Sequence, residues 1–260
     1  IGIRDWSSDV CSSDLCERQT QPGFTHWGSF AELVALDHAE VNLVALPETM
    51  SSVTAASLGC RFATAYRALT VHGRVGLADQ VVVHGCGGVG LSAVMVAVAA
   101  GARVVAVDPS PTARKLAAEL GAEVVLDPSG LGAEEVALLV ADATGGGADV
   151  SLDALGHQDA VVASVLGLRR RGRHVQVGLL LGAQARSPLP MDRVVGWELE
   201  VYGSHGMAAH EYPAMLAAVA SGALSPARLV GRTIGLEGAA EALAAMSGAA
   251  TAAGMTVVVP

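Results

Sequence analysis

The sequence predicts an α/β fold built on a doubly wound, parallel six-stranded sheet. Three observations favour it: short segments that are apolar along their whole length recur through the middle of the chain, helix-patterned segments separate them, and a glycine-rich turn follows the first. Strands of this kind are typical of parallel sheets whose two faces are both covered by helices. Six such strands suit the spatial order 3-2-1-4-5-6.

The expected elements alternate regularly. The strands are predicted at 81–83, 104–107, 124–126, 150–152, 175–177 and 199–202, and the helices between them at 91–100, 111–120, 132–143 and 159–168. Pro111 stands in a first turn, where a missing N–H is tolerated. An arginine-rich stretch, 169–173, follows the last of these helices, and we expect it to stabilise the helix C-terminus and a solvated turn.

A second region is predicted on either side of this alternation. Two short strands are expected at 30–36 and 41–46, and a helix capped by serine is expected over 51–68. After Gly203 the alternation stops. The remaining elements, which we assign to the same second region, are helices at 212–220 and 239–246 and a strand at 255–259.

The beginning of the chain does not fit either region. Residues 1–15 have neither helical nor strand periodicity, and the unit Ser-Ser-Asp occurs twice within them. We expect this segment to be foreign to the fold or disordered. The predicted domain organisation is therefore 1–15 for this segment, 16–61 and 206–260 for the second region, and 62–205 for the α/β domain.

Composition excludes several classes of function. A net charge of −9 argues against nucleic-acid binding, because nothing would neutralise phosphates. The best apolar run, 91–102, is too short to cross a bilayer. The start of the sequence lacks a basic segment followed by an apolar stretch, so no export signal is predicted. The four cysteines have no paired spacing, which favours a reducing, cytoplasmic environment. With these classes excluded, we expect the partner to be a small molecule.

The glycine-rich turn predicts a dinucleotide site. Residues 85–90 read Gly-Cys-Gly-Gly-Val-Gly, a G-x-G-x-x-G pattern between a buried strand and a helix. Gly85 permits the tight turn, Gly87 lets the backbone approach a pyrophosphate, and Gly90 lets the helix pack against the strand. The pyrophosphate would lie at the positive helix N-terminus. Together these features predict a Rossmann domain.

Asp108 favours NAD over NADP. It ends the second predicted strand, where a carboxylate can accept hydrogen bonds from both adenosine ribose hydroxyls and would repel a 2′-phosphate. Arg114 and Lys115 could reach a phosphate, but we interpret both as part of a solvated helix face. Cys86, inside the glycine turn, is interpreted as a small filler and not a nucleophile.

Four local patterns carry a family resemblance. They are Thr-His-Trp-Gly-Ser-Phe-Ala-Glu at 25–32, Leu-Gly-Cys-Arg-Phe-Ala-Thr-Ala-Tyr at 58–66, Asp-Ala-Leu-Gly at 153–156 with the turn and strand at 172–178, and Gly-Ser at 203–204. With the glycine turn, they resemble the medium-chain dehydrogenase/reductase superfamily, and within it the bacterial zinc-dependent alcohol dehydrogenases. The resemblance covers 16–259. It implies that the second region is the remnant of a GroES-like, β-rich catalytic domain whose N-terminal part is missing.

The resemblance also implies roles for individual residues. Cys60 would be a ligand of a catalytic zinc, and Cys16 the last of four cysteines around a structural zinc. Thr64 would pack against the nicotinamide. The remaining implied contacts to NAD come from Gly88 and Val89 in the glycine turn, and from Gly178, Leu179 and Ser204 near the carboxamide. A homodimer or homotetramer is implied as well.

The implied activity is reversible hydride transfer between NAD and a primary or secondary alcohol, yielding an aldehyde or ketone. A catalytic zinc needs three protein ligands and one open position. None of the eight histidines has a matching context, so we expect this chain to be an inactive, truncated form. Two alternatives stay open: a zinc-free, NADPH-dependent quinone or enoyl reductase of the same superfamily, and a non-catalytic dinucleotide-binding fragment.

Overall fold

The computed structural model describes residues 20–246 and 254–260. It divides into two compact units. One is Thr64–Ser204, and the other contains the described residues up to Ala63 and from His205 onward. The segment 1–15 and Cys16 lie outside the described residues, so the expectations about them stay predictions.

The unit Thr64–Ser204 is built on one parallel sheet of six strands in the order β3-β2-β1-β4-β5-β6. Every neighbouring pair of strands in it is parallel. The predicted fold class and strand order are therefore confirmed. The strands are β1 Gln80–His84, β2 Arg103–Val107, β3 Val124–Leu126, β4 Ala148–Asp153, β5 Leu168–Gln176 and β6 Glu200–Gly203.

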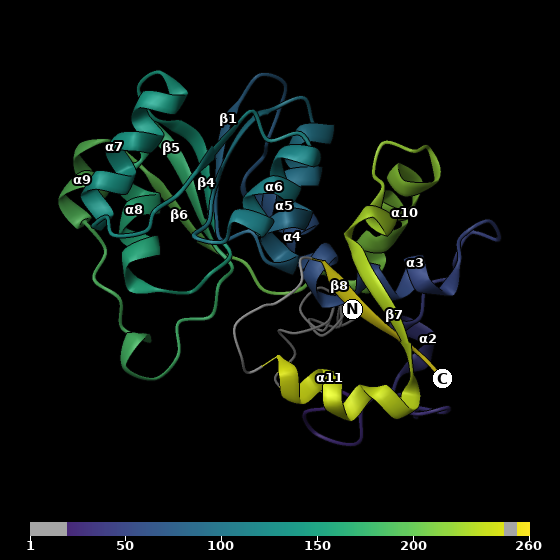
Figure 1. The fold of residues 1–260 in the computed structure, drawn as a ribbon. Coiled ribbons are helices and arrows are strands. Elements are labelled where there is room, and N and C mark those ends of the chain that lie inside the picture. Colours follow the sequence, from purple (N-terminus) through teal and green to yellow (C-terminus); the bar gives the residue numbers. More distant parts are fainter. Residues whose placement is uncertain (1–19, 247–253) are drawn as a thin grey trace, which may run out of the picture. The chain divides into compact units, whose positions relative to one another are not determined.

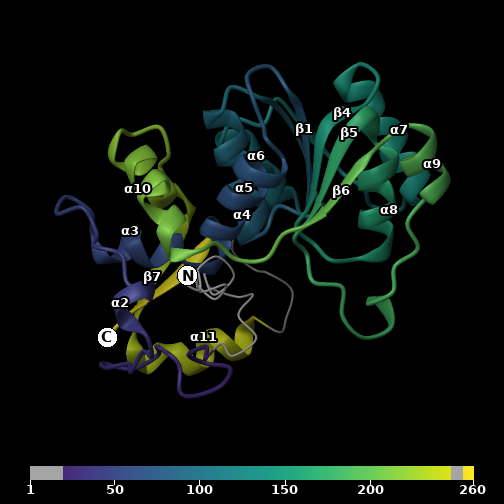
Figure 2. The ribbon, with the colours of Figure 1, turned by 180° about the vertical axis from the view of Figure 1, so that it is seen from behind.

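Helices cover both faces of this sheet. Figure 1 shows α5 (Gly88–Ala99) and α6 (Pro111–Glu119) against one face and α7 (Ala133–Thr144) and α8 (Gln158–Leu166) against the other, and Figure 2 shows the two layers from behind. The core strands are consequently apolar on both sides, and Val81, Val82 and Val83 are fully buried. Shorter elements complete the unit: α4 Ala63–Arg67, η2 Ala68–His72, η3 Gly182–Gln184 and α9 Met191–Gly196.

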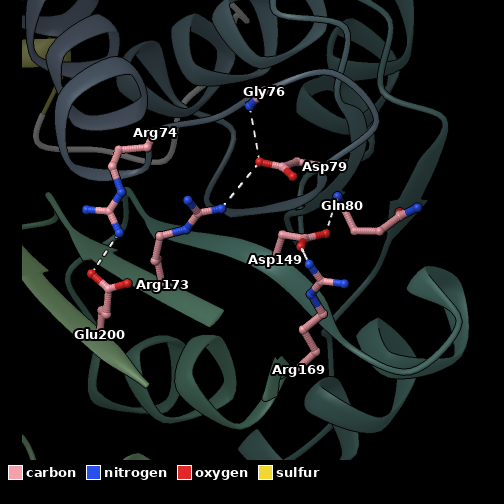
Figure 3. Close-up of polar contacts among 8 residues, drawn as sticks. All are labelled: Arg74, Gly76, Asp79, Gln80, Asp149, Arg169, Arg173 and Glu200. Atoms are coloured by element: carbon pink, nitrogen blue, oxygen red, sulfur yellow. Dashed lines mark hydrogen bonds and ion pairs between the residues drawn. The ribbon is translucent and has the colours of Figure 1, made fainter. Parts of the chain in front are cut away.

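The arginine-rich stretch lies in a strand, so its predicted place at a helix C-terminus is wrong. Helix α8 ends at Leu166, and β5 runs through the arginines. Carboxylates at the beginning of two other strands pair with these arginines: Asp79 directly precedes β1, and Asp149 lies in β4. Arg173 Nη2 lies 3.3 Å from Asp79 Oδ2, and Arg169 forms an ion pair with Asp149. Figure 3 shows these contacts together with the hydrogen bond from the Gln80 N–H to Asp149.

The second unit has little sheet. The strands predicted at 30–36 and 41–46 are wrong: within the described residues no strand forms there, and α2 (Ala39–Asn42) occupies part of the second. A strand needs a partner for its backbone groups, and none of the described strands pairs with this stretch. Leu33 is 89% exposed.

The other elements of this unit follow the sequence more closely. Ser51 caps α3 (Ser52–Ser57) by accepting from the Thr54 N–H at 3.1 Å, and the helix continues through η1 (Leu58–Phe62) despite non-helical angles at Gly59. The later elements are η4 Ala209–Glu211, α10 Tyr212–Ala220, η5 Pro226–Leu229, β7 Val230–Gly235, η6 Leu236–Gly238, α11 Ala239–Ala245 and β8 Met255–Val259. Strands β7 and β8 pair in parallel. Among the described helices, none has the length and apolar character needed to cross a membrane.

Candidate functional site

The glycine turn connects β1 to α5, and its three motif glycines occupy different kinds of space. Gly85 has φ +87°, which favours glycine. A Cβ on Gly90 would lie 1.7 Å from the Gly85 carbonyl oxygen, so this residue must stay glycine for the helix to pack against the turn. Gly87, the N-cap of α5, has open space around its missing Cβ. The turn therefore leaves an uncovered cradle at a helix N-terminus, as a pyrophosphate requires.

Asp108 follows β2 and is held against the glycine turn. Its Oδ2 accepts a hydrogen bond from the Cys86 N–H at 2.6 Å, and its Oδ1 accepts from the Ser110 N–H at 2.7 Å. Because β1 and β2 are adjacent parallel strands, their following turns lie at the same edge of the sheet. The carboxylate is thereby fixed beside the cradle, where the adenosine ribose of a dinucleotide would lie.

The two nearby cations are already engaged. Arg114 Nη1 donates to the Asp108 carbonyl oxygen at 2.6 Å, and Arg114 Nη2 lies 2.9 Å from Asp127 Oδ2. Lys115 Nζ lies 3.9 Å from Glu119 Oε1 on the helix surface. Arg114 is thus tied to a carboxylate of its own, which limits its ability to attract a 2′-phosphate.

Cys86 is a buried filler within the turn. Burial, together with the nearby Asp108 carboxylate, raises the pKa of its thiol to about 12. The side chain therefore stays protonated at neutral pH, which agrees with its interpretation as a packing residue and not a nucleophile.

Two predicted contact residues carry buried hydroxyls without an internal partner. Thr64, in α4, and Ser204, just after β6, are 5% and 7% exposed. Neither hydroxyl finds a hydrogen-bond partner among the described residues. Buried polar groups are rarely left unpaired, so a polar ligand in this unit would fit them.

The turns after β4 and β5 lie against each other. A Cβ on Gly178 would lie 2.2 Å from the Gly156 amide nitrogen, and the Gly178 N–H donates to the Asp153 carbonyl oxygen at 2.8 Å. Leu179, next in the chain, is 64% exposed. The predicted nucleotide residues of the sheet therefore follow β1, β2, β5 and β6 at their carboxyl ends, the edge where open α/β sheets bind ligands.

Comparison with known proteins now assigns the family. The profile of the family described as "Zinc-binding dehydrogenase" matches residues 88–221, just over half of the chain. The chain belongs to the zinc-binding dehydrogenase family. The predicted resemblance to medium-chain, zinc-type alcohol dehydrogenases is confirmed.

Individual relatives agree with this zinc-binding dehydrogenase assignment. The chain is 36% identical to 5-exo-hydroxycamphor dehydrogenase of Pseudomonas putida over 63% of this chain and 46% of the relative. It is 32% identical to an alcohol dehydrogenase of Geobacillus stearothermophilus over 75% of this chain and 56% of the relative. The solved alcohol dehydrogenase of Thermus sp. ATN1 superposes with a TM-score of 0.80 at 30% identity, over 92% of this chain and 69% of that one. The chain spans about half the length of the curated relatives it matches.

Of the two predicted zinc ligands in this zinc-binding dehydrogenase, only Cys60 lies among the described residues. Cys60 lies in η1, outside the sheet-containing unit, with an exposed and free thiol. Across residues 20–246 and 254–260, no three His, Cys, Asp or Glu side chains gather in a way that could hold a metal ion. The described residues therefore do not by themselves fit a catalytic zinc, which needs three protein ligands.

Sequence reasoning missed a layer of buried polar side chains in the dehydrogenase sheet. His84, Asp153 and His174 are all nearly or fully buried, although they lie in apolar strands. The available signal was a polar residue at the last position of a strand, as in Val-Val-Val-His at 81–84 and Ser-Leu-Asp at 151–153. Polar groups are expensive to bury without partners, so such residues indicate a network.

Proposed function

We propose that this chain carries the cofactor-binding part of an NAD-dependent alcohol dehydrogenase. The reaction would be reversible hydride transfer between NAD and a primary or secondary alcohol, with release of the hydroxyl proton and formation of an aldehyde or ketone. The observation that supports it best is Asp108, held by the Cys86 N–H beside the open cradle at Gly87. When bound, the nicotinamide would supply the hydride acceptor.

The chain's own groups favour NAD for electrostatic reasons. The Asp108 carboxylate can accept hydrogen bonds from ribose hydroxyls but repels a 2′-phosphate, and Arg114 is already paired with Asp127. The cradle itself contributes backbone N–H groups and the positive end of α5. Thr64 and Ser204 offer the unpaired hydroxyls for the nicotinamide end.

The substrate class rests on the relatives. Several of those matching this chain are named for alcohols or polyols, including erythritol/L-threitol dehydrogenase of Mycolicibacterium smegmatis at 36% identity over 56% of this chain. A role for Cys60 as a zinc ligand stays a prediction, and no step is assigned to a metal. The described residues support the cofactor-binding part of the proposal.

The first test is the preference for NADH over NADPH. We expect the wild-type chain to bind NADH more tightly, and Asp108→Asn to narrow the ratio of the two dissociation constants by about tenfold, because one like-charge repulsion is removed. Titration of the reduced-nicotinamide fluorescence measures both constants. Wild-type preference for NADPH would contradict the proposal and support the quinone or enoyl reductase alternative.

A second expectation concerns metal removal. NADH affinity should stay within about twofold after treatment with a chelator, because the cradle binds through backbone N–H groups and a carboxylate already satisfied by protein donors. Isothermal titration before and after treatment tests this, with metal content measured in both samples. A large loss of affinity on chelation would place a metal in the cofactor site and refute this account of it.

A further inference from the structure

Asp153 joins two turns at the carboxyl edge of the sheet. It is the last residue of β4 and is fully buried. Its Oδ1 accepts from the Leu155 N–H at 2.7 Å and the Gly156 N–H at 3.1 Å. Its Oδ2 accepts from Gln176 Nε2 at 2.7 Å. One carboxylate therefore fixes the turn after β4 and, through Gln176, reaches the strand beside it.

Gln176 carries the connection into the turn after β5. Its Nε2 also donates to the Gly178 carbonyl oxygen at 2.7 Å. The Asp153 carbonyl oxygen accepts in return from the Val177 N–H at 3.0 Å and the Gly178 N–H at 2.8 Å. Backbone and side chain of Asp153 thus both hold the segment that leads to Leu179.

The network also fixes its own orientation. Both partners of Gln176 Nε2 are acceptors, so the amide nitrogen faces them and Oε1 faces His174 Nε2, 3.1 Å away. His174 Nε2 must then donate, which leaves Nδ1 as the acceptor, within 3.1 Å of the Ser151 hydroxyl and 3.0 Å of the Ser164 hydroxyl. Burial lowers the pKa of His174, which keeps this ring neutral. Gln176 and His174 therefore each have one compatible orientation.

The glycine turn packs against Leu155, but its hydrogen bonds do not involve the Asp153 side chain. The Gly85 N–H donates to the Val107 carbonyl oxygen at 2.8 Å, and the Cys86 N–H donates to Asp108. The parts of the sheet edge that would hold the adenosine diphosphate therefore depend on Asp108 and α5. The turns at 154–156 and 177–179 depend on Asp153.

We propose that Asp153 is a positioning residue for the nicotinamide end of the cofactor. It fixes the backbone at Gly178 and Leu179, and so aligns the groups that would contact the carboxamide, without touching the cofactor itself. This rests on the proposed NAD-binding function. It adds that two carboxylates position different ends of the cofactor: Asp108 lies at the adenosine end, and Asp153 fixes the turn at the nicotinamide end.

Asp153→Asn tests the proposal because it replaces one carboxylate oxygen by an NH2 group and changes the side-chain volume little. If the new amide keeps its oxygen toward Leu155 and Gly156, its nitrogen faces Gln176 Nε2, donor against donor. If Gln176 turns over instead, it presents a donor to His174 Nε2 and leaves the Gly178 carbonyl oxygen unpaired. Either arrangement loosens the turn after β5.

The matched control is Asp149→Asn. Asp149 is also buried, accepts from the Gln80 N–H at 2.8 Å and pairs with Arg169 (Figure 3). It is the second residue of β4, whereas Asp153 is the last. Removing its charge disturbs a buried carboxylate and its two partners, one of them the largely exposed Arg169, at the other end of the strand from the proposed site. It separates a general loss of stability from a loss of positioning.

The experiment measures dissociation constants of the full chain for NADH and for ADP-ribose, which lacks the nicotinamide. For Asp153→Asn we expect NADH binding to weaken about fivefold to tenfold while ADP-ribose changes less than about twofold. Asp149→Asn should leave the ratio of the two constants unchanged. Gln176→Met removes the side-chain bonds of Gln176 to Asp153, Gly178 and His174 but leaves the bonds of Asp153 to Leu155 and Gly156. It should show the same selective loss and serves if Asp153→Asn does not fold.

Three results would count against the idea in different ways. Equal weakening of NADH and ADP-ribose by Asp153→Asn would make the residue structural only and overturn the positioning role. An unchanged ratio in both Asp153→Asn and Gln176→Met would do the same. A wild-type chain that binds neither ligand would instead overturn the proposed function, and the positioning role with it.

Discussion

Replacing Gly87 by alanine is expected to weaken NADH binding about a hundredfold while changing the free energy of unfolding by less than about 0.5 kcal/mol. The backbone at Gly87 has φ −76° and ψ −162°, which alanine adopts without strain. No atom lies within 4 Å of the added Cβ, so the folded chain accommodates it. The methyl group would occupy the space through which a pyrophosphate approaches the N-terminus of α5.

Gly90→Ala is the matched variant three residues later. It should destabilise the fold itself, whereas Gly87→Ala should weaken NADH binding and leave the fold intact. Its Cβ would lie 1.7 Å from the Gly85 carbonyl oxygen and 2.8 Å from the Gly85 carbonyl carbon. Both are backbone atoms, so α5 must move, and we expect about 3 kcal/mol or more to be lost from the free energy of unfolding. Urea denaturation and NADH titration of both variants decide the matter. Normal NADH affinity in Gly87→Ala would show that the dinucleotide does not bind at this turn.

The sheet could be predicted because its signals are local. The central strands contain short apolar runs whose burial on both faces leaves no alternation to interpret, as in 81–83 and 104–107. The strand order then follows from the right-handed connections that doubly wound sheets obey. The glycine turn was predictable for the same reason, since its conformational demands fall on three residues within a span of six.

What could not be predicted depends on partners distant in sequence. The arginines of β5 looked like the end of a helix because Asp79, the partner of Arg173, lies 94 positions away. The stretches 30–36 and 41–46 have strand-like composition, yet strand formation requires a neighbouring strand, and the described residues provide none there. Pattern alone carries no information about whether such a partner exists.

The same limit applied to the site. Asp108 was predictable from its distance to the glycine turn, whereas the link between Asp153 and Gln176 arises from the register that sets β4 against β5. In the sequence these two residues are separated by a helix and by the arginine-rich strand. Their identity as polar residues at strand ends was visible, but their pairing was not.

His84 provides the second large effect, because it is buried as a neutral side chain. It ends β1, is 3% exposed, and its Nε2 has no hydrogen-bond partner among the described residues. Burial lowers the pKa of this imidazole from 6.5 to about 4. The nearby Asp153 opposes that shift and the nearby His174 adds to it, but the loss of solvation dominates.

The sign of the pH dependence follows from this depressed pKa. The unfolded chain takes up a proton on His84 near pH 6.5 and the folded chain only near pH 4, so the contribution of this residue to stability is present above pH 6.5 and is lost as the pH falls toward 4. At pH 5 the loss amounts to about 2 kcal/mol relative to pH 7.5.

His84→Leu, of similar volume, removes the titrating group and should lose about 2 kcal/mol less stability than the wild type over that interval. Urea denaturation at the two pH values measures this, with His210→Gln at an exposed position as the control that should keep the wild-type pH dependence. Parallel losses in His84→Leu and the wild type would show that burial of this histidine is not the source of acid sensitivity, and the acid-labile step would then have to be sought among the other buried polar residues of the sheet.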